Sequence, residues 1–167
     1  MREKKSLPVV TVRLKTERRL IGETTINTPE KAMELIRREL GDMAREVVMA
    51  LYLDTAGHPI AVGLISAGTM DQTSVSAVQI FQTALLCNSR SVIFFHNHPS
   101  QNLTASNEDI QMTRTMIACG DLLGVRILDH IIVGGDKYMS MKENGTVDFE
   151  PKMTLDERIK ESGIYQR

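Results

Sequence analysis

The chain has 167 residues, of which 42% are hydrophobic and 25% are charged, and its formal net charge is -1. That length is enough for one domain with a buried core, and the composition is that of a water-soluble globular protein. The small net charge excludes an overall field that would attract nucleic acid or anionic lipid. No apolar run approaches the ~18 residues of a membrane span.

Charge is distributed unevenly along the chain. Residues 1–50 carry 11 Lys and Arg against 8 Asp and Glu, whereas residues 51–167 carry 9 against 13. A basic N-terminal edge of this kind is usually a solvated face, so nucleic-acid binding is possible but not favoured. Cys87 and Cys119 are far apart in sequence, and the charged start lacks the apolar core of a signal peptide. We therefore expect two buried thiols in a reducing, cytoplasmic setting.

The N-terminal third predicts a β-hairpin followed by a helix. Alternating apolar residues predict strands over 9–15 and 19–26 with a turn between them. Thr28 is a candidate N-cap with Pro29 at the first helical position. The helix that follows should bury Met33, Ile36 and Leu40 on one face and stop at Gly41.

The rest of the chain alternates between strands and helices. A helix that begins at residue 77 should bury Val78, Phe81 and Leu85, and another that begins at residue 107 should end at Gly120. Strands that are apolar throughout belong at the centre of a sheet covered on both faces. The pattern predicts an α/β fold, a three-layer α-β-α sandwich with a mixed sheet. The expected strands are 46–54, 60–66, 91–96, 125–133 and 137–141, the expected helices are 77–87 and 107–119, and a tail helix is expected at 154–161.

A metal-binding pattern follows the strand 91–96. His96 and His98 are two residues apart, so an extended chain directs both imidazoles to one side. Pro99 ends regular strand pairing, and the next helix carries Asp109 in its first turn. Two imidazoles and one carboxylate with an open fourth position are typical of a catalytic zinc site. No further Cys or His stands in this loop to close the site.

Each part of this pattern also has a structural interpretation. A His-x-His pair by itself is usually not a pair of ligands, and Ser106-x-x-Asp109 is also a capping box that would start the helix. Both readings of the second pattern can hold together, because a capped helix start would keep Asp109 rigid. The convergence of polar groups at the carboxyl end of an apolar strand favours a binding site, since open α/β sheets place ligands there.

The pattern His96-x-His98-Pro99-x6-Ser106-x-x-Asp109 resembles the JAMM motif of the JAB/MPN metalloprotease family. Glu46, directly before an apolar strand, matches the glutamate of that family. Within it, the chain is similar to the bacterial RadC-type branch over about residues 28–145. Gln101 and Ala105 depart from the usual Gly and Pro of that branch. The matching segments are 51–54, 68–69, 96–100, 128–134, 138–140 and 143–145.

This resemblance implies a JAB/MPN architecture, similar to that of cytidine deaminases, and a zinc-dependent hydrolase of peptide or isopeptide bonds. Zn²⁺ would be held by His96, His98 and Asp109 and would activate a water. Glu46 would act as the general base, and Ser106 would donate to the oxyanion. The resulting division is an N-terminal hairpin extension at 1–27, the metallohydrolase domain at 28–145 and a polar tail at 146–167.

Other functions stay open at this stage. A RadC-like domain could be a non-catalytic or DNA-associated binding module linked to DNA repair or mobile elements. A zinc deaminase would need an H-x-E and a P-C-x-x-C motif, and the sequence has neither.

Asn97 should point away from the ligands, and His130, after Asp129, is either a core histidine or a supporting residue of the metal site. The substrate is expected to be a peptide or protein, without a membrane partner, and the oligomeric state stays open.

Overall fold

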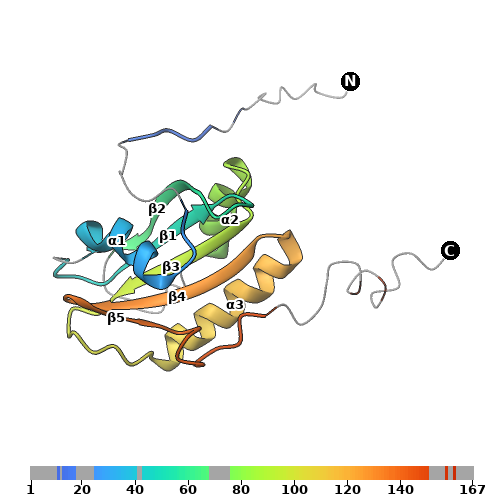
Figure 1. The fold of residues 1–167 in the computed structure, drawn as a ribbon. Helices are drawn as coiled ribbons and strands as arrows, with labels where there is room; N and C mark the ends of the chain where they lie inside the picture. The colour runs from blue at the N-terminus through green and yellow to red at the C-terminus, as the bar shows by residue number, and fades with distance from the viewer. Residues whose placement is uncertain are drawn as a thin grey trace, which may run out of the picture.

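The structure, a computed structural model, describes residues 11, 13–17, 25–40, 43–67, 76–150, 157 and 160. Three helices and five strands alternate through this part of the chain (Figure 1). In chain order they are α1 (Pro29–Leu40), β1 (Val47–Leu53), β2 (Pro59–Ala67), α2 (Ala77–Leu86), β3 (Ser91–Asn97), α3 (Asn107–Leu123), β4 (Arg126–Gly134) and β5 (Lys137–Ser140).

The five strands form one mixed sheet in the order β2-β1-β3-β4-β5. β1 pairs antiparallel with β2 and with β3, β3 pairs parallel with β4, and β4 pairs antiparallel with β5. β3 is therefore the central strand, and every one of its residues is buried. The predicted α/β sandwich with a mixed sheet is confirmed.

Each face of the sheet is covered by different helices. The residues of α1 pack against one set of alternating strand positions, which includes Met49, Ile93 and Phe95. Helices α2 and α3 pack against the other set, which includes Ala50 and Phe94. Because alternate residues of a strand face opposite sides, His96 lies on the face of α2 and α3, whereas Asn97 lies on the face of α1.

The helix starts and faces follow local chemistry in part. The Thr28 hydroxyl accepts a hydrogen bond from the amide of Lys31 at 3.4 Å, and Met33, Ile36 and Leu40 are buried as predicted. In α2 the predicted face is wrong at Val78 and Leu85, which are 73% and 53% exposed. The apolar residues of α2 lie on all sides of the helix, so their spacing does not determine which side meets the sheet. The side chains that do so are Ile80, Phe81 and Ala84.

Helix α3 is longer than predicted. It passes through Gly120 and ends at Gly124, which has the left-handed conformation (φ 69°) common after helix ends. Gly120 serves another purpose, because a Cβ atom there would lie 2.3 Å from the carbonyl oxygen of Val125. The glycine permits the start of β4 to pack against the helix, and sequence alone did not distinguish this role from a cap.

The predicted N-terminal hairpin and tail helix fall largely outside the described residues. Among their described members, residues 11, 13–17 and 25–27 are not part of a strand. Ile26 donates a backbone hydrogen bond to Gly57 in the turn between β1 and β2. In the described part of the chain, no helix has both the length and the apolar character needed to cross a bilayer.

Candidate metal centre

The site begins where β3 ends. His96 is buried within the strand, and the chain continues through His98, whose amide donates to the carbonyl of Val133 on β4 at 2.8 Å. A turn follows, closed by the amide of Gln101 and the carbonyl of His98 at 2.9 Å. The end of the central strand thus places two imidazoles beside the first turn of α3.

A complete capping box fixes Asp109 in that first turn. The Ser106 hydroxyl accepts from the amide of Asp109 at 3.0 Å, and Asp109 Oδ2 accepts from the amide of Ser106 at 2.8 Å. The same hydroxyl donates to Asp109 Oδ2 at 2.6 Å. The structural and the site interpretations of this motif therefore hold together. The Ser106 proton is directed at the carboxylate, so its predicted role towards an oxyanion would require the hydroxyl to turn.

Asp109 contacts both histidines of the motif. His96 Nδ1 lies 2.7 Å from Asp109 Oδ1, and His98 Nε2 lies 3.5 Å from Asp109 Oδ2. Burial by itself would raise the pKa of Asp109, but hydrogen bonds from His96 and Ser106 outweigh it and hold the pKa well below its usual range. The carboxylate is therefore ionised, as a metal ligand must be.

The partners of each Nδ1 atom determine where the imidazole lone pairs point. The carbonyl of Asn102, 2.6 Å from His98 Nδ1, can only accept, so Nδ1 carries the proton and Nε2 has the lone pair. The ionised Asp109 likewise accepts a hydrogen bond from His96 Nδ1. The lone pair of His98 therefore faces a carboxylate oxygen at 3.5 Å. Two acceptors facing one another are stabilised by a cation between them.

Glu46 lies at the open side of this group, one residue before β1. Its Oε2 atom is 3.9 Å from His96 Nε2, and its side chain is 37% exposed. The pairing of Val48 with His96 in neighbouring strands brings the start of β1 to the end of β3. All five predicted site residues are thus brought together, and their chemical roles stay predictions.

Asn97 attaches the segment that carries Glu46 to the sheet. Its Oδ1 atom accepts from the amide of Val47 at 2.6 Å, and its Nδ2 atom donates to the carbonyls of Met43 and Arg45 at 3.1 and 3.0 Å. The side chain lies on the face of α1, as expected. Its partners are 50 or more residues away in sequence, and no local pattern identifies them.

A third imidazole, His130 of β4, lies beside the group, and the motif did not include it. One possible ligand atom from each of His96, Asp109 and His130 lies within 4.8 Å of the others, and the rings of His96 and His130 stack at 6.2 Å. The neighbouring Asp129 is directed elsewhere, since it accepts from the Ser140 hydroxyl at 2.5 Å and from the Lys142 amide. The Asp129-His130 dipeptide was the available sequence signal.

The donor set fits a zinc ion. Imidazole nitrogens and a carboxylate oxygen are the usual ligands of catalytic zinc. Within the described residues, the Nε2 atoms of His96 and His130 are buried and have no hydrogen-bond partner. Buried polar nitrogens without partners in the protein are uncommon and call for a partner such as an ion or a water. His96, His98 and Asp109 are the predicted ligands, and His130 is an additional candidate.

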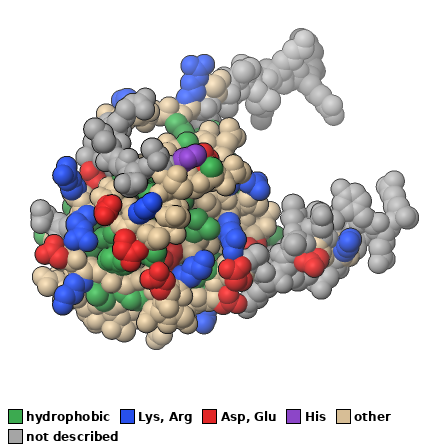
Figure 2. All heavy atoms as spheres, viewed as in Figure 1, with side chains coloured by type: hydrophobic (Ala, Val, Ile, Leu, Met, Phe, Trp, Pro, Cys, Tyr) green, Lys and Arg blue, Asp and Glu red, His purple; other side chains and the backbone are tan. Residues whose placement is uncertain are grey.

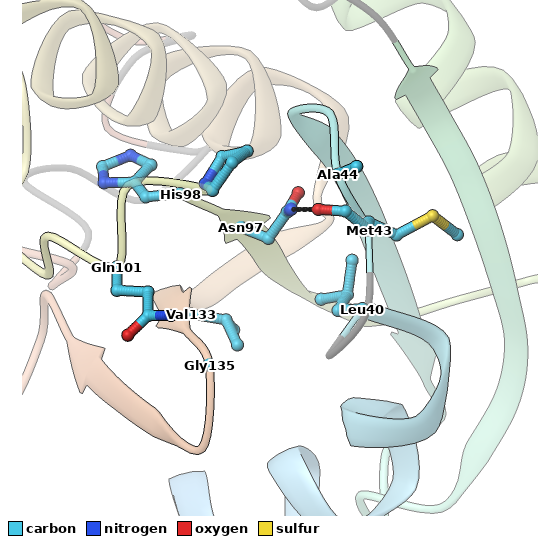
Figure 3. Close-up of a pocket in the computed structure, with 9 residues that line it drawn as sticks. Leu40, Met43, Ala44, Asn97, His98, Gln101, Val133 and Gly135 are labelled. Carbon is cyan, nitrogen blue, oxygen red and sulfur yellow. Dashed lines mark hydrogen bonds between the residues drawn. The ribbon is translucent and has the colours of Figure 1, made fainter.

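A pocket of about 210 Å³ adjoins the site at His98. Figure 3 shows Leu40 and Met43 on one side of it and Gln101 and Gly135 on the other. Apolar residues and uncharged polar residues thus share its walls. Its complete lining is Leu40, Met43, Ala44, Asn97, His98, Pro99, Gln101, Val133 and Gly135.

The fold and the site together define an α/β domain with a His-x-His and Asp cluster at the end of its central strand. Residues 26–146 match the family described as the RadC-like JAB domain, and the chain belongs to that family. It is 37% identical to a UPF0758 protein of Desulfitobacterium hafniense over 120 residues, which is 72% of this chain and 53% of that protein. It is 38% identical to a UPF0758 protein of Shouchella clausii over 133 residues, which is 80% and 57%.

These matches establish the family of the chain but not its reaction. The chain spans just over half the length of the curated relatives it matches, and their names state no activity. The match confirms the RadC-type resemblance and the JAB class of fold. The reaction, the metal and the partners belong to the proposal below.

Proposed function

We propose that the protein is a zinc-dependent hydrolase that cleaves a peptide or isopeptide bond. The observation that carries the proposal is the approach of the His98 Nε2 lone pair to the ionised Asp109 carboxylate, 3.5 Å apart and beside the buried Nε2 of His96. His96, His98 and Asp109 would hold the ion. Zinc bound in this way supplies a Lewis acid and lowers the pKa of a water towards ~7.

Glu46 would move the proton. Its carboxylate is within 3.9 Å of His96 and partly open to solvent, so it can reach a water at the site and later the leaving amine. General acid–base catalysis of this kind is worth ~10²–10⁴ in rate. Asn97 would keep Glu46 in place through the backbone on both sides of it. Ser106 would hold Asp109 and, after turning, could donate to the oxyanion of the tetrahedral intermediate.

The surroundings favour a peptide over a nucleic acid. No Lys or Arg occurs between Glu46 and Ser89, and the lining of the pocket beside His98 combines apolar and uncharged polar residues without a Lys or Arg. We propose that a residue next to the scissile bond occupies this pocket. A cytoplasmic location is part of the same proposal, because free thiols suit a reducing compartment. Cys87 and Cys119 are both free thiols, but they are half-buried and not buried as predicted.

Zinc binding is the first prediction. Protein purified without chelators is expected to contain about one equivalent of zinc per chain, measured by elemental analysis. The His96→Ala, His98→Ala double variant should lose that zinc, whereas His58→Ala should keep it, since His58 pairs with Asp54 in a surface turn. A wild-type protein without zinc, or a double variant that retains it, would contradict the proposed metal site.

Glu46→Gln is expected to keep the zinc and to lower hydrolysis by ~10²–10⁴, because the amide cannot accept a proton. The measurement is cleavage of a mixed library of peptides and isopeptide-linked peptides, followed by mass spectrometry. Glu108→Gln, an exposed change one residue before Asp109, is the matched control. Loss of zinc from Glu46→Gln would make Glu46 a ligand, and no cleavage by zinc-loaded wild type would favour a binding module.

A further inference from the structure

His130 is set apart from ordinary core histidines by the partners of its ring. Its side chain is fully buried in β4, on the same face of the sheet as His96. Its Nδ1 atom lies 2.7 Å from the Thr113 hydroxyl of α3, whereas its Nε2 atom has no partner among the described residues. One half of the imidazole is therefore satisfied and the other half is not.

The hydrogen bonds of Thr113 determine the tautomer. The Thr113 hydroxyl has one proton, and the carbonyl of Asp109, 2.6 Å away, can only accept it. The oxygen must then accept from His130 Nδ1, so the proton of His130 is on Nδ1 and the lone pair is on Nε2. The chain thus prepares an unprotonated nitrogen inside the protein.

The ring with the unsatisfied nitrogen lies within a group of possible metal ligands. His130 stacks on His96 at 6.2 Å, and one possible ligand atom of each of His96, Asp109 and His130 lies within 4.8 Å of the others. In His96 and His98, too, Nδ1 donates to an oxygen, that of Asp109 at 2.7 Å and that of the Asn102 carbonyl at 2.6 Å. The imidazoles of His96, His98 and His130 therefore share the Nδ1-protonated tautomer that zinc ligation through Nε2 requires.

We propose that His130 is a fourth ligand of the metal centre, which binds zinc through Nε2 from the interior of the protein. This inference rests on the proposed function for the metal itself and adds to it the ligand that the loop sequence lacks. The resting centre then has three imidazoles and one carboxylate. A reacting water would have to enter as an additional ligand, and catalytic zinc sites allow such an expansion. Thr113 is a positioning residue, because it acts only through the His130 ring.

The test is nuclear magnetic resonance of the full chain with ¹⁵N-labelled histidine and ¹¹³Cd in place of zinc. The chain has 4 histidines, and we expect three of them, His96, His98 and His130, to show Nε2 coupling to cadmium. His58 is the internal control without coupling. Coupling at His96 and His98 alone would overturn the inference and leave the proposed function intact. A chain that binds neither cadmium nor zinc would overturn both.

Zinc affinity provides the second measurement, by competition with a chromophoric chelator. His130→Gln is expected to weaken zinc binding at least ~100-fold, and Thr113→Val, which keeps the imidazole but frees its tautomer, ~10-fold. A merely structural His130 would alter the unfolding of the metal-free protein but leave zinc affinity within about twofold. If His130→Gln does not fold, the cadmium couplings of the wild-type chain decide the matter.

Discussion

Asn97 stands between the two histidines of the motif but acts on the opposite face of the sheet. Its one amide group makes three hydrogen bonds to backbone atoms of residues 43–47. The oxygen accepts from the Val47 amide, and the nitrogen serves two carbonyls, so only an amide satisfies every partner. The residue between the ligands therefore determines where the proposed base is placed.

Asn97→Ala is expected to lower the free energy of unfolding by about 2–4 kcal/mol, because it leaves the buried amide of Val47 and two carbonyls unsatisfied. Asn97→Asp should be at least as damaging, since a carboxylate oxygen would face the carbonyls of Met43 and Arg45. Urea unfolding measures both. Hydrogen exchange at the Val47 amide should accelerate in Asn97→Ala.

The matched control for Asn97 is Asn144→Ala, an exposed asparagine that donates to the Thr146 hydroxyl. Surface changes of this type are expected to stay within about 0.5 kcal/mol. Equal stability of the Asn97→Ala and Asn144→Ala variants would show that the hydrogen bonds of Asn97 to residues 43–47 do not stabilise the fold.

At the scale of elements, the turn after β3 contains a residue with a strained backbone. Gln101 has a left-handed backbone with φ 60°. Such a conformation costs a residue with a Cβ about 1–2 kcal/mol. Gly134 packs against this turn, since a Cβ there would lie 2.9 Å from the Gln101 carbonyl oxygen. The turn that follows His98 is thus packed closely against the end of β4.

Gln101→Gly is expected to stabilise the protein by up to about 1 kcal/mol, because relief of the left-handed strain exceeds the added entropy of the unfolded chain. Thermal unfolding of the metal-free protein measures the change. Gln111→Gly, in an exposed position within α3, is the control and should cost about 1 kcal/mol. If both glycine variants lose stability equally, the turn is not strained at Gln101.

For the whole molecule, a buried neutral histidine links stability to pH. The pKa of His130 falls from 6.5 to about 3 on folding, mainly through burial. The unfolded chain therefore binds a proton that the folded chain excludes between these values, and stability is lost as the pH falls below 6.5. Asp109, whose pKa is lowered by folding, contributes stability above its unfolded pKa of about 3.9 and loses it only at lower pH.

The free energy of unfolding of the metal-free protein is expected to drop by about 2–3 kcal/mol between about pH 7 and about pH 4.5 through His130. Urea unfolding at several pH values in chelator measures it. His130→Gln should remove this part of the pH dependence, whereas His58→Gln, at the surface, should leave it. An unchanged pH dependence in His130→Gln would show that His130 does not resist protonation in the folded chain.

The charge of the whole molecule also bears on its partners. Acidic and basic side chains are interspersed over the face shown in Figure 2, and the net charge is -1. Tight binding to DNA needs several cations on one surface, each adding about -0.9 to the slope of log affinity against log salt. DNA binding therefore remains an unfavoured possibility. The division at residues 27 and 145 and the cytoplasmic location stay predictions.

Sequence by itself determined what depends on neighbours along the chain. A spacing of two placed His96 and His98 on one side, Ser106 and Asp109 predicted the start of α3, and the continuous apolar runs predicted buried strands. These features follow from backbone geometry and local hydrogen bonds, which a few consecutive residues specify. The family resemblance then added Glu46, which no local pattern would have selected.

Tertiary structure decided what depends on which elements become neighbours. The parallel pairing of β3 with β4 and the packing of α3 on that face bring His130 beside His96 and Asp109. The same packing required Gly120 at a close approach rather than as a cap, and it chose the buried face of α2. Apolar periodicity predicts that a face is buried, but it does not predict which element covers that face. The contacts that complete this site span between 13 and 54 residues of sequence, as from His96 to Asp109 and from Asn97 to Met43.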